Sequence, residues 1–395
     1  MRSNNLNTVL IFFLHTCKPG SGARFILILF FLLLNSCIVQ FIPEISEEQE
    51  LLVVEGLVTD QPQADTIKLS RSLPLGEKSA ARPQSGCTVK ILDDLGNSFI
   101  LEEIKAGTYI TNSATFKGEI GRSYTLQITT NNGLKNQNYE SFPMEMKPVP
   151  PIDSIYYEKK VVKEDIAGWF GIDACQIYLD THDPENICKF YRWDYSETWV
   201  HRLLFPVPNM ICWISDVSEK TIIKSTAAFE ESRITRNPVT YITNYTDRLK
   251  WEYSILVNQY SLNEEEYIYW EKVQNFTDQV GGLYDLIPAS IPGNIISLNN
   301  PNEKVLGYFS VSAMSSKRIF IKENFAGIID RYDKCVTDTI YGDYDPPELN
   351  VSLWTLIDHP ASFYPRTRVL TDNYGCYDCR TRGTNKKPDF WINDK

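Results

Sequence analysis

Two cysteines near the end of the chain, Cys376 and Cys379, have a spacing that could do chemistry. A Cys-x-x-Cys pair can supply half of a zinc site, act as a redox pair or take part in structural disulfides. A structural zinc needs four ligands, and neither a second such pair nor a nearby histidine supplies the others. A thioredoxin-like pair would open a helix after a strand, whereas Asn373-Tyr-Gly375 precedes this one. We therefore favour a disulfide that staples a loop, formed between these two cysteines or with Cys335 or Cys212.

A different thiol chemistry is indicated at Cys37, which follows a run of ten apolar residues, Phe25–Leu34, and a small residue. Ten residues make about 15 Å of helix, roughly half of what a bilayer span needs. Lys18 and Arg24 precede the run, as in the basic region of a signal peptide. This pattern is typical of a bacterial lipoprotein signal. We predict that residues 1–36 are removed and that Cys37 carries acyl chains that anchor the protein to a membrane.

Four acidic residues crowd a loop rich in tyrosine and proline: Asp338, Asp343, Asp345 and Glu348. Carboxylate oxygens in a flexible loop could hold calcium. The spacing is not that of a regular calcium loop, so a solvated acidic turn is the favoured interpretation. We predict no metal site.

Catalytic motifs are scarce. After the signal only His182, His201 and His359 remain, and the sequence has no His-Glu-x-x-His, Gly-x-Ser-x-Gly, P-loop or Gly-x-Gly-x-x-Gly arrangement. An enzyme built from this chain would need a pair of carboxylates. We predict no catalytic residues and no cofactor. An envelope enzyme that acts on glycans with a carboxylate pair stays as the alternative.

The composition favours a strand-rich protein with an acidic surface. Tyr, Phe, Thr, Ile, Val and Asn are abundant, and 20 glycines and 21 prolines separate short segments. The formal net charge is −11, and the predicted signal contributes no acidic residue. This balance argues against nucleic acid or an anionic lipid surface as partner. Attachment to a membrane must therefore come from the lipid.

Short segments that alternate apolar and polar residues, with turn residues between them, fill the chain from residue 51 to 146. Such alternation is typical of strands with one solvent-facing side. The expected strands cover residues 51–57, 66–69, 87–92, 98–102, 107–110 and 123–129. Short strands with regular turn signals predict an immunoglobulin-like β-sandwich.

The stiff segment 147–151, Lys-Pro-Val-Pro-Pro, marks the expected domain boundary. Beyond it, antiparallel strands are expected at 153–162, 175–180, 189–199, 250–259 and 305–320. From about Asp343 the tail should form ordered loops packed on this domain. The expected organisation is a signal at 1–36, a tether at 37–50, a sandwich at 51–146 and a larger β-rich domain at 147–395.

One helix is expected near residues 263–278. Asn263 can cap it, and aromatic and apolar residues three apart, from Tyr267 to Phe276, give it an aromatic face. Such a face is more often core than a ligand site. The same holds for the strand tryptophans that could line a groove, namely Trp193, Trp199, Trp213 and Trp251.

Several stretches together point to a family. They are 52–59, 67–72, 150–154, 281–283 with 287–288, 293–295, 306–312, and 376–380 with 383–384 and 387–391. They resemble domain of unknown function 4249, a family of outer-membrane lipoproteins of Bacteroidota. The resemblance covers nearly all of the mature chain, and the terminal Cys-x-x-Cys-Arg and Pro-Asp-Phe-Trp motifs are its most specific part. It implies no activity and no catalytic residues.

Members of this family are often encoded beside TonB-dependent outer-membrane transporters. The resemblance therefore implies a lipid-anchored accessory of such a transporter in nutrient capture; an assembly or adhesion factor is another alternative. Acidic residues shortly after the lipidated cysteine, here within residues 44–50, resemble the signal for export to the cell surface, although a solvated linker has the same composition. We expect an outer-membrane, surface-exposed protein. Thr66, Ser154 and Thr339 match the O-glycosylation pattern of these bacteria.

Overall fold

The structure, a computed structural model, divides the chain into residues 1–49 and 50–395, and all described residues belong to the second unit. They are 50–72, 82–131, 136–163, 171–203, 207–218, 220–243, 245–279, 291–322, 337–341, 355–358, 367–371 and 374–391. For 277–279, 337–341, 355–358 and 367–371 only the backbone is described. The predicted signal, the tether up to residue 49 and Cys37 lie outside them. No helix in the described part has the length and hydropathy of a membrane span.

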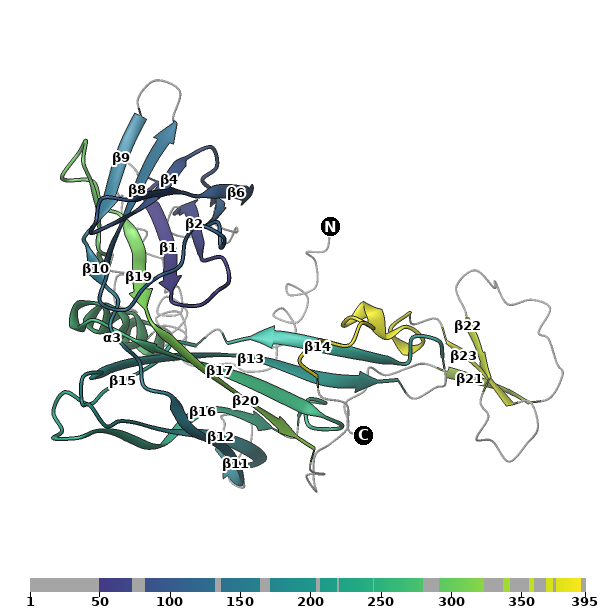
Figure 1. Cartoon of the computed structure of the whole chain (residues 1–395). Coiled ribbons are helices and arrows are strands. Elements are labelled where there is room, and N and C mark those ends of the chain that lie inside the picture. Colours follow the sequence, from purple (N-terminus) through teal and green to yellow (C-terminus); the bar gives the residue numbers. More distant parts are fainter. Residues whose placement is uncertain are drawn as a thin grey trace, which may run out of the picture. The chain divides into compact units, whose positions relative to one another are not determined.

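The first body is a β-sandwich of two six-stranded sheets (Figure 1). The first sheet has the order β19 (Leu306–Ser312), β1 (Leu52–Thr59), β2 (Thr66–Arg71), β7 (Thr108–Ile110), β6 (Glu102–Lys105), with β3 (Arg82–Pro83) on β2. The second has the order β18 (Ile295–Ser297), β9 (Asn136–Ser141), β8 (Ser123–Asn131), β4 (Thr88–Asp93), β5 (Ser98–Ile100), with β10 (Met144–Glu145) on β8.

Alternating side chains of both sheets form one core. Val54 and Ile67 of the first sheet are fully buried together with Ile91 and Leu126 of the second. Because successive side chains of a strand point to opposite faces, the residues between them remain on the outer surface of each sheet. The predicted sandwich is confirmed, and its alternation leaves a polar outer face on the first sheet.

The sandwich is not confined to residues 51–146, which corrects the expected domain boundaries. Strands β18 and β19 come from a distant part of the chain, and β19 lies parallel to β1 over Val53–Thr59. Phe309 and Val311 of β19 belong to the core of the sandwich. Strand patterns mark a segment as a strand but do not name its partner, so the sequence could not reveal this pairing.

Gly307 makes the parallel pairing possible. Its φ is +85°, a conformation that side chains with a Cβ rarely adopt, and a Cβ there would lie 2.0 Å from the carbonyl oxygen of Val54. Asn294 adds a second connection, because its side-chain amide donates to the carbonyl oxygen of Phe309 and its carbonyl oxygen accepts from the Phe309 amide. Gly307 thus allows β19 to lie against β1, and Asn294 ties β19 to the segment that precedes β18.

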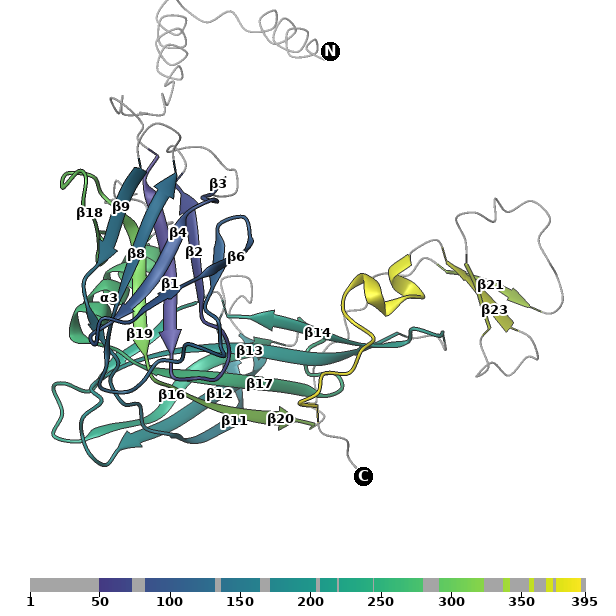
Figure 2. The ribbon, with the colours of Figure 1, turned by 45° about the horizontal axis from the view of Figure 1, so that its top comes forward.

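The second body consists of antiparallel sheets around a second core (Figure 2). One sheet has the order β11 (Ile152–Val162), β12 (Ile172–Asp183), β16 (Ser232–Thr243). The other has the order β14 (Ile211–Val217), β13 (Phe190–Arg202), β17 (Tyr253–Ser261), β20 (Met314–Ile321), with β15 (Ile222–Ser225) on β13. Trp193 is fully buried in this core and donates to the side-chain oxygen of Gln259, which lies opposite it in the register of β13 and β17.

The predicted helix is confirmed as α3 (Glu264–Gln279). The carbonyl oxygen of Asn263 accepts from the Tyr267 amide, which begins the helix. The Asn263 side chain donates to the carbonyl oxygen of Glu145 instead of capping the helix. The helix is thereby tied to the segment that leaves the sandwich.

From the sequence, the tail is expected to consist of loops after Asp343. The structure corrects this expectation, because part of the tail forms strands. Strands β21 (Thr337–Tyr341), β23 (Thr367–Thr371) and β22 (Thr355–Asp358) form a small sheet in this order. Segments such as Thr-Arg-Val-Leu-Thr carry the alternation and β-branched residues of a strand, which the richness in proline and glycine around them obscured. Residues 374–391 do pack on the second body, with short helices η2 (Tyr374–Cys376) and η3 (Cys379–Thr381).

Candidate functional site

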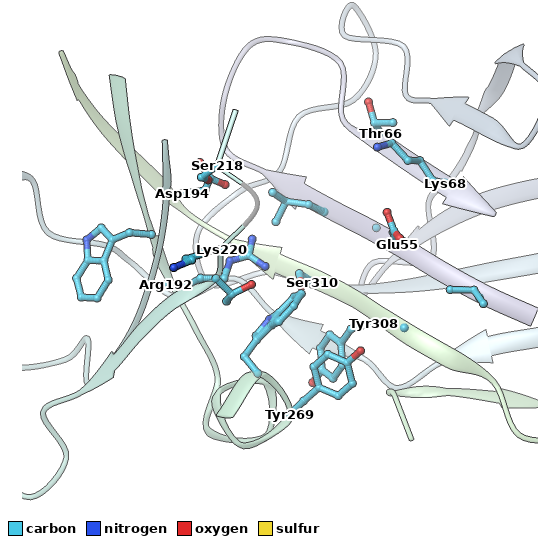
Figure 3. A pocket seen from close by; sticks show the side chains of 17 residues that line it. Glu55, Thr66, Lys68, Arg192, Asp194, Ser218, Lys220, Tyr269, Tyr308 and Ser310 are labelled. Atoms are coloured by element: carbon cyan, nitrogen blue, oxygen red, sulfur yellow. The ribbon is translucent and has the colours of Figure 1, made fainter. Parts of the chain in front are cut away.

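A cleft of about 700 Å³ lies between the outer face of the first sheet, the edge of the second body and helix α3 (Figure 3). Its volume is typical of sites for small ligands. Glu55, Thr66 and Lys68 lie on one side of it, and Arg192 and Lys220 lie across from them in Figure 3.

The sandwich wall follows from strand alternation. Ile67 and Leu69 point into the core, so Thr66 and Lys68 on the same strand face the cleft. Glu55 lies directly opposite Lys68 in the register of β1 and β2. This wall therefore presents matched charges of opposite sign.

Strand β13 forms the facing wall by the same rule. Trp193 points into the second core, and its neighbours Arg192 and Asp194 point to the other face. Asp194 lies opposite Asn258 of β17 and accepts a hydrogen bond of 2.8 Å from its side-chain amide. The register of β13 and β17 thus fixes the position of this carboxylate.

Helix α3 closes the cleft with aromatic side chains. Tyr269 packs on Tyr308 of β19, with ring centroids 4.7 Å apart, and its ring meets that of Trp270 edge-on. The Trp270 indole donates to Oε1 of Glu266 one turn earlier, at 3.2 Å. Trp270 of the predicted aromatic face, for which the sequence favours a core position, therefore lines the cleft together with Tyr269.

Arg192 is the charged residue of this lining that keeps a buried donor unpaired among the described residues. Its guanidinium carbon lies 4.7 Å from the centre of the Tyr260 ring and 5.0 Å from that of Trp270. Tyr260 is its cross-strand partner in the register of β13 and β17. Its Nε is buried without a hydrogen-bond partner in the described part of the chain. The side chain is held by stacking, and a donor remains unpaired.

Behind Trp270, Glu266 is completely buried, and its Oε2 has no hydrogen-bond partner among the described residues. Burial raises the pKa of Glu266, while the charge of Arg192 and the side chains of Ser310 and Trp270 act in the opposite direction. Glu266 is not part of the cleft lining.

A second hollow, of about 480 Å³, is lined by residues that use their charges on one another. Glu197 accepts hydrogen bonds of 2.6 Å from both Arg248 and Tyr253. Asp247 accepts from Arg382 at 2.9 Å, and its other contact, with Nδ1 of His201, is 3.0 Å long.

The electrostatics of Asp247 reflect this pairing. Burial by itself would raise its pKa, but the hydrogen bonds from His201 and Arg382 outweigh that effect and lower the pKa to about 2. The carboxylate therefore stays ionised and holds Arg382, which belongs to the C-terminal segment. We assign this network a structural role.

The sequence left several disulfide pairings open, and the structure contains one of them. Cys212 and Cys379 form a disulfide that links β14 to the C-terminal segment, and both are fully buried. Cys376 is also disulfide-bonded, but its partner is not among the described residues, and Cys335 lies outside them as well. A bond between Cys376 and Cys379 is excluded by the first pairing. Cys87, Cys175 and Cys188 are not disulfide-bonded.

The remaining predicted positions do not converge on one site. Thr66 lines the cleft, Ser154 donates to Asp180, and Thr339 lies in β21, where only the backbone is described. Of the calcium candidates, Asp338 lies in β21 as well, and Asp343, Asp345 and Glu348 fall outside the described residues. Within the described part, no three His, Cys, Asp or Glu side chains are grouped to hold a metal ion.

The strand tryptophans are mostly structural. Trp193 and Trp199 belong to the second core, and Trp213 meets Trp391 edge-on. Sequence reasoning missed Arg192 and Lys220 as site residues, because neither belongs to a motif. The available signal was an arginine on a strand between two large apolar residues, Tyr191 and Trp193, which places it on the opposite face.

Comparison with known proteins gives a family but no characterised relative. No curated protein matches the chain. A family model described as a domain of unknown function, DUF4249, matches residues 39–318. This region contains every cleft residue named above and ends before the Cys-x-x-Cys motif. Since the match covers more than half of its length, the chain belongs to the DUF4249 family.

Proposed function

We propose that this protein is a non-enzymatic, lipid-anchored accessory of a TonB-dependent outer-membrane transporter that captures a small nutrient in the cleft between strands β1, β2, β13 and β19 and helix α3. The observation that carries the proposal is the cleft itself. It has the volume of a small-ligand site, and it combines aromatic walls with charged groups that are not all paired.

The anchoring part of the proposal rests on the sequence. The apolar run before Cys37 is too short to span a bilayer and ends at a lipobox cysteine. Acyl chains on Cys37 would hold the body at the outer membrane, where the cleft could pass its ligand to a transporter.

The cleft gives little support to a glycan-acting enzyme. A general acid needs a raised pKa and access to the substrate. Glu266 has the raised pKa, but it is completely buried and lies outside the lining. Of the two described carboxylates that line the cleft, Asp194 accepts a hydrogen bond from Asn258 and Glu55 lies opposite Lys68, so each has a partner that favours its ionised form.

The test is recovery of the transporter. A tagged full-length protein, expressed in its native host and purified from detergent-solubilised outer membranes, should bring down a TonB-dependent transporter in comparable amount. Recovery of porins and assembly factors with no such transporter would overturn the proposal and favour the assembly role.

The control for anchoring is Cys37→Ser. This variant should leave the outer-membrane fraction and lose the transporter, while Cys87→Ser, which removes a free thiol of the sandwich, should change neither. Membrane retention of a processed Cys37→Ser protein would contradict the anchor.

A further inference from the structure

The ligand class of the cleft can be inferred from the hydrogen-bonding state of Arg192. Its guanidinium is stacked between Tyr260 and Trp270, and its buried Nε has no acceptor in the described structure. A buried charged donor without an acceptor is costly, and protein interiors rarely leave one unmatched. Nε itself is closed to solvent, but the two terminal nitrogens of the guanidinium are not buried and also have no acceptor among the described residues, so a ligand oxygen in the cleft would accept from them.

We propose that the cleft binds an anionic ligand whose carboxylate or phosphate oxygens accept hydrogen bonds from Arg192, with Lys220 as the second cation. This inference rests on the proposed capture function and specifies its ligand. A guanidinium is a planar fork of donors that matches carboxylate and phosphate geometry. Because the two rings already restrict the side chain, little further entropy is lost when the ligand binds.

Among the described residues that line the cleft, three are cationic (Lys68, Arg192 and Lys220) and two are carboxylates (Glu55 and Asp194), which leaves one positive charge in excess. Lys68 lies opposite Glu55 across β1 and β2, so their charges offset each other. Asp194 accepts a hydrogen bond from the neutral Asn258 amide and keeps its negative charge, and the buried Glu266 carboxyl group also interacts electrostatically with Arg192. Arg192 and Lys220 then remain on the same side of the cleft, away from Thr66 and Lys68 (Figure 3). An anion that enters from solvent would meet a local positive charge in a protein whose formal net charge is −11.

The aromatic wall adds a second requirement. Tyr269, Trp270 and Tyr308 form a continuous cluster beside Arg192. Aromatic side chains at a binding surface favour ligands with an apolar face of their own, such as a sugar ring. The ligand that fits both features is a ring compound with an acidic substituent, for which glucuronate and glucose 6-phosphate are simple probes and glucose is the neutral control.

The test is isothermal titration calorimetry of the detergent-solubilised full-length protein with these three probes at low ionic strength. Glucuronate or glucose 6-phosphate should bind at least tenfold more tightly than glucose. Lys220→Gln should weaken binding of the anion about threefold to tenfold, as expected for loss of one nearby charge. Lys224→Gln, an exposed lysine of β15 that does not line the cleft, should leave it unchanged.

Arg192→Met keeps the aliphatic stem and removes the donors, and it should weaken anion binding at least tenfold. Lys220 is exposed, so its variant keeps the test valid even if Arg192→Met fails to fold. Equal affinity for glucose and both anions would overturn the ligand class while leaving capture intact. Anion binding that survives both substitutions, or no binding of either anion, would overturn the inference, and transporter recovery tests capture separately.

Discussion

Strand β13 lines two hollows on its opposite faces, and they differ in how their charges are used. In the second hollow Glu197 and Asp247 accept short hydrogen bonds from Arg248 and Arg382. In the cleft, Arg192 stacks on rings and keeps a buried donor unpaired. Both hollows are large enough for a ligand or several waters. The difference lies in the charged groups: Glu197, Asp247, Arg248 and Arg382 of the second hollow form ion pairs that hold the fold together, and the buried donor left unpaired there among the described residues, Nε1 of Trp199, is neutral.

The presence of arginines and carboxylates in a hollow is therefore not sufficient to identify a ligand-binding site. In the second hollow the ionic network holds the C-terminal segment, together with the disulfide between Cys212 and Cys379. Removing its charges should affect stability. Removing charges of the cleft should affect ligand binding with a smaller effect on stability.

The largest effect on stability should come from disturbing the pairing of β19 with β1, which forms part of the cleft wall, without changing a charged residue. Gly307→Ala forces a strained φ and places a Cβ against the carbonyl of Val54, so we expect a loss of about 4 kcal/mol in the free energy of unfolding. Gly96 has a similar φ of +87° but open space around it, and Gly96→Ala should cost only about 1 kcal/mol. Urea unfolding measures both. Equal losses in the free energy of unfolding for the two variants would show that the close approach of β19 to β1 at Gly307 does not contribute to stability.

The next largest effect on stability should come from the ion pairs of the second hollow. Asp247→Ala leaves Arg382 and His201 without their shared acceptor and should cost about 3 kcal/mol. Asp216→Ala, in the lining of the same hollow but exposed, is the matched control and should change stability by less than about 0.5 kcal/mol. Thermal and urea unfolding give these values. Weakened ligand binding in Asp247→Ala, with the fold intact, would mean that the second hollow is a site after all.

The pH dependence of stability should have opposite signs in the two bodies. The pKa of Asp247 is lowered to about 2, so its contribution of about 2 kcal/mol is present above pH 4 and is lost as the pH falls toward 2. Burial raises the pKa of Asp65 in the sandwich to about 7, despite hydrogen bonds from Thr59. Ionisation of Asp65 is therefore unfavourable in the folded state, and the free energy of unfolding should fall as the pH rises from about 4 through 7.

Urea unfolding across this pH range, with Asp247→Asn and Asp65→Asn beside the unsubstituted protein, checks both signs. The stability advantage of the unsubstituted protein over Asp247→Asn should shrink in acid. As the pH rises, the free energy of unfolding of the unsubstituted protein should fall relative to that of Asp65→Asn. A parallel pH profile for the protein and either variant would contradict the assigned pKa shift.

The smallest stability effect should be that of Arg192→Met. It removes two cation–π contacts and the favourable charge near buried Glu266, but also the cost of an unpaired donor, so we expect a loss of about 1 kcal/mol. Differential scanning calorimetry gives the shift. A loss as large as that of Asp247→Ala would mean that Arg192 is a structural residue like Arg382, and the contrast between the hollows would disappear.

The sequence predicted the elements well and their assembly only in part. Alternation identified β1, β2, β4, β5, β7 and β8 of the sandwich but not β9 or β18. Aromatic spacing identified α3 to within one residue at each end. It could not predict that Leu306–Ser312 would join Val53–Thr59 in a parallel pair, because pairing partners are set by tertiary packing and not by local pattern. The cleft depends on that pairing, since Tyr308 and Gly307 lie in its wall.

The site residues were hidden for a related reason. Arg192 is placed by its strand register opposite Tyr260 and by a helix that begins more than 70 positions later. No motif in the sequence connects these segments. The cysteine pair, in contrast, stood out by its spacing, and what the sequence could not decide was the partner of each thiol.

The most direct test of the account is a crystal structure of the protein with glucuronate bound. We predict the sugar in the cleft, with its carboxylate within hydrogen-bond distance of Arg192 and its ring beside Trp270. Glucuronate bound in the second hollow at Arg248 or Arg382, with an empty cleft, would contradict it.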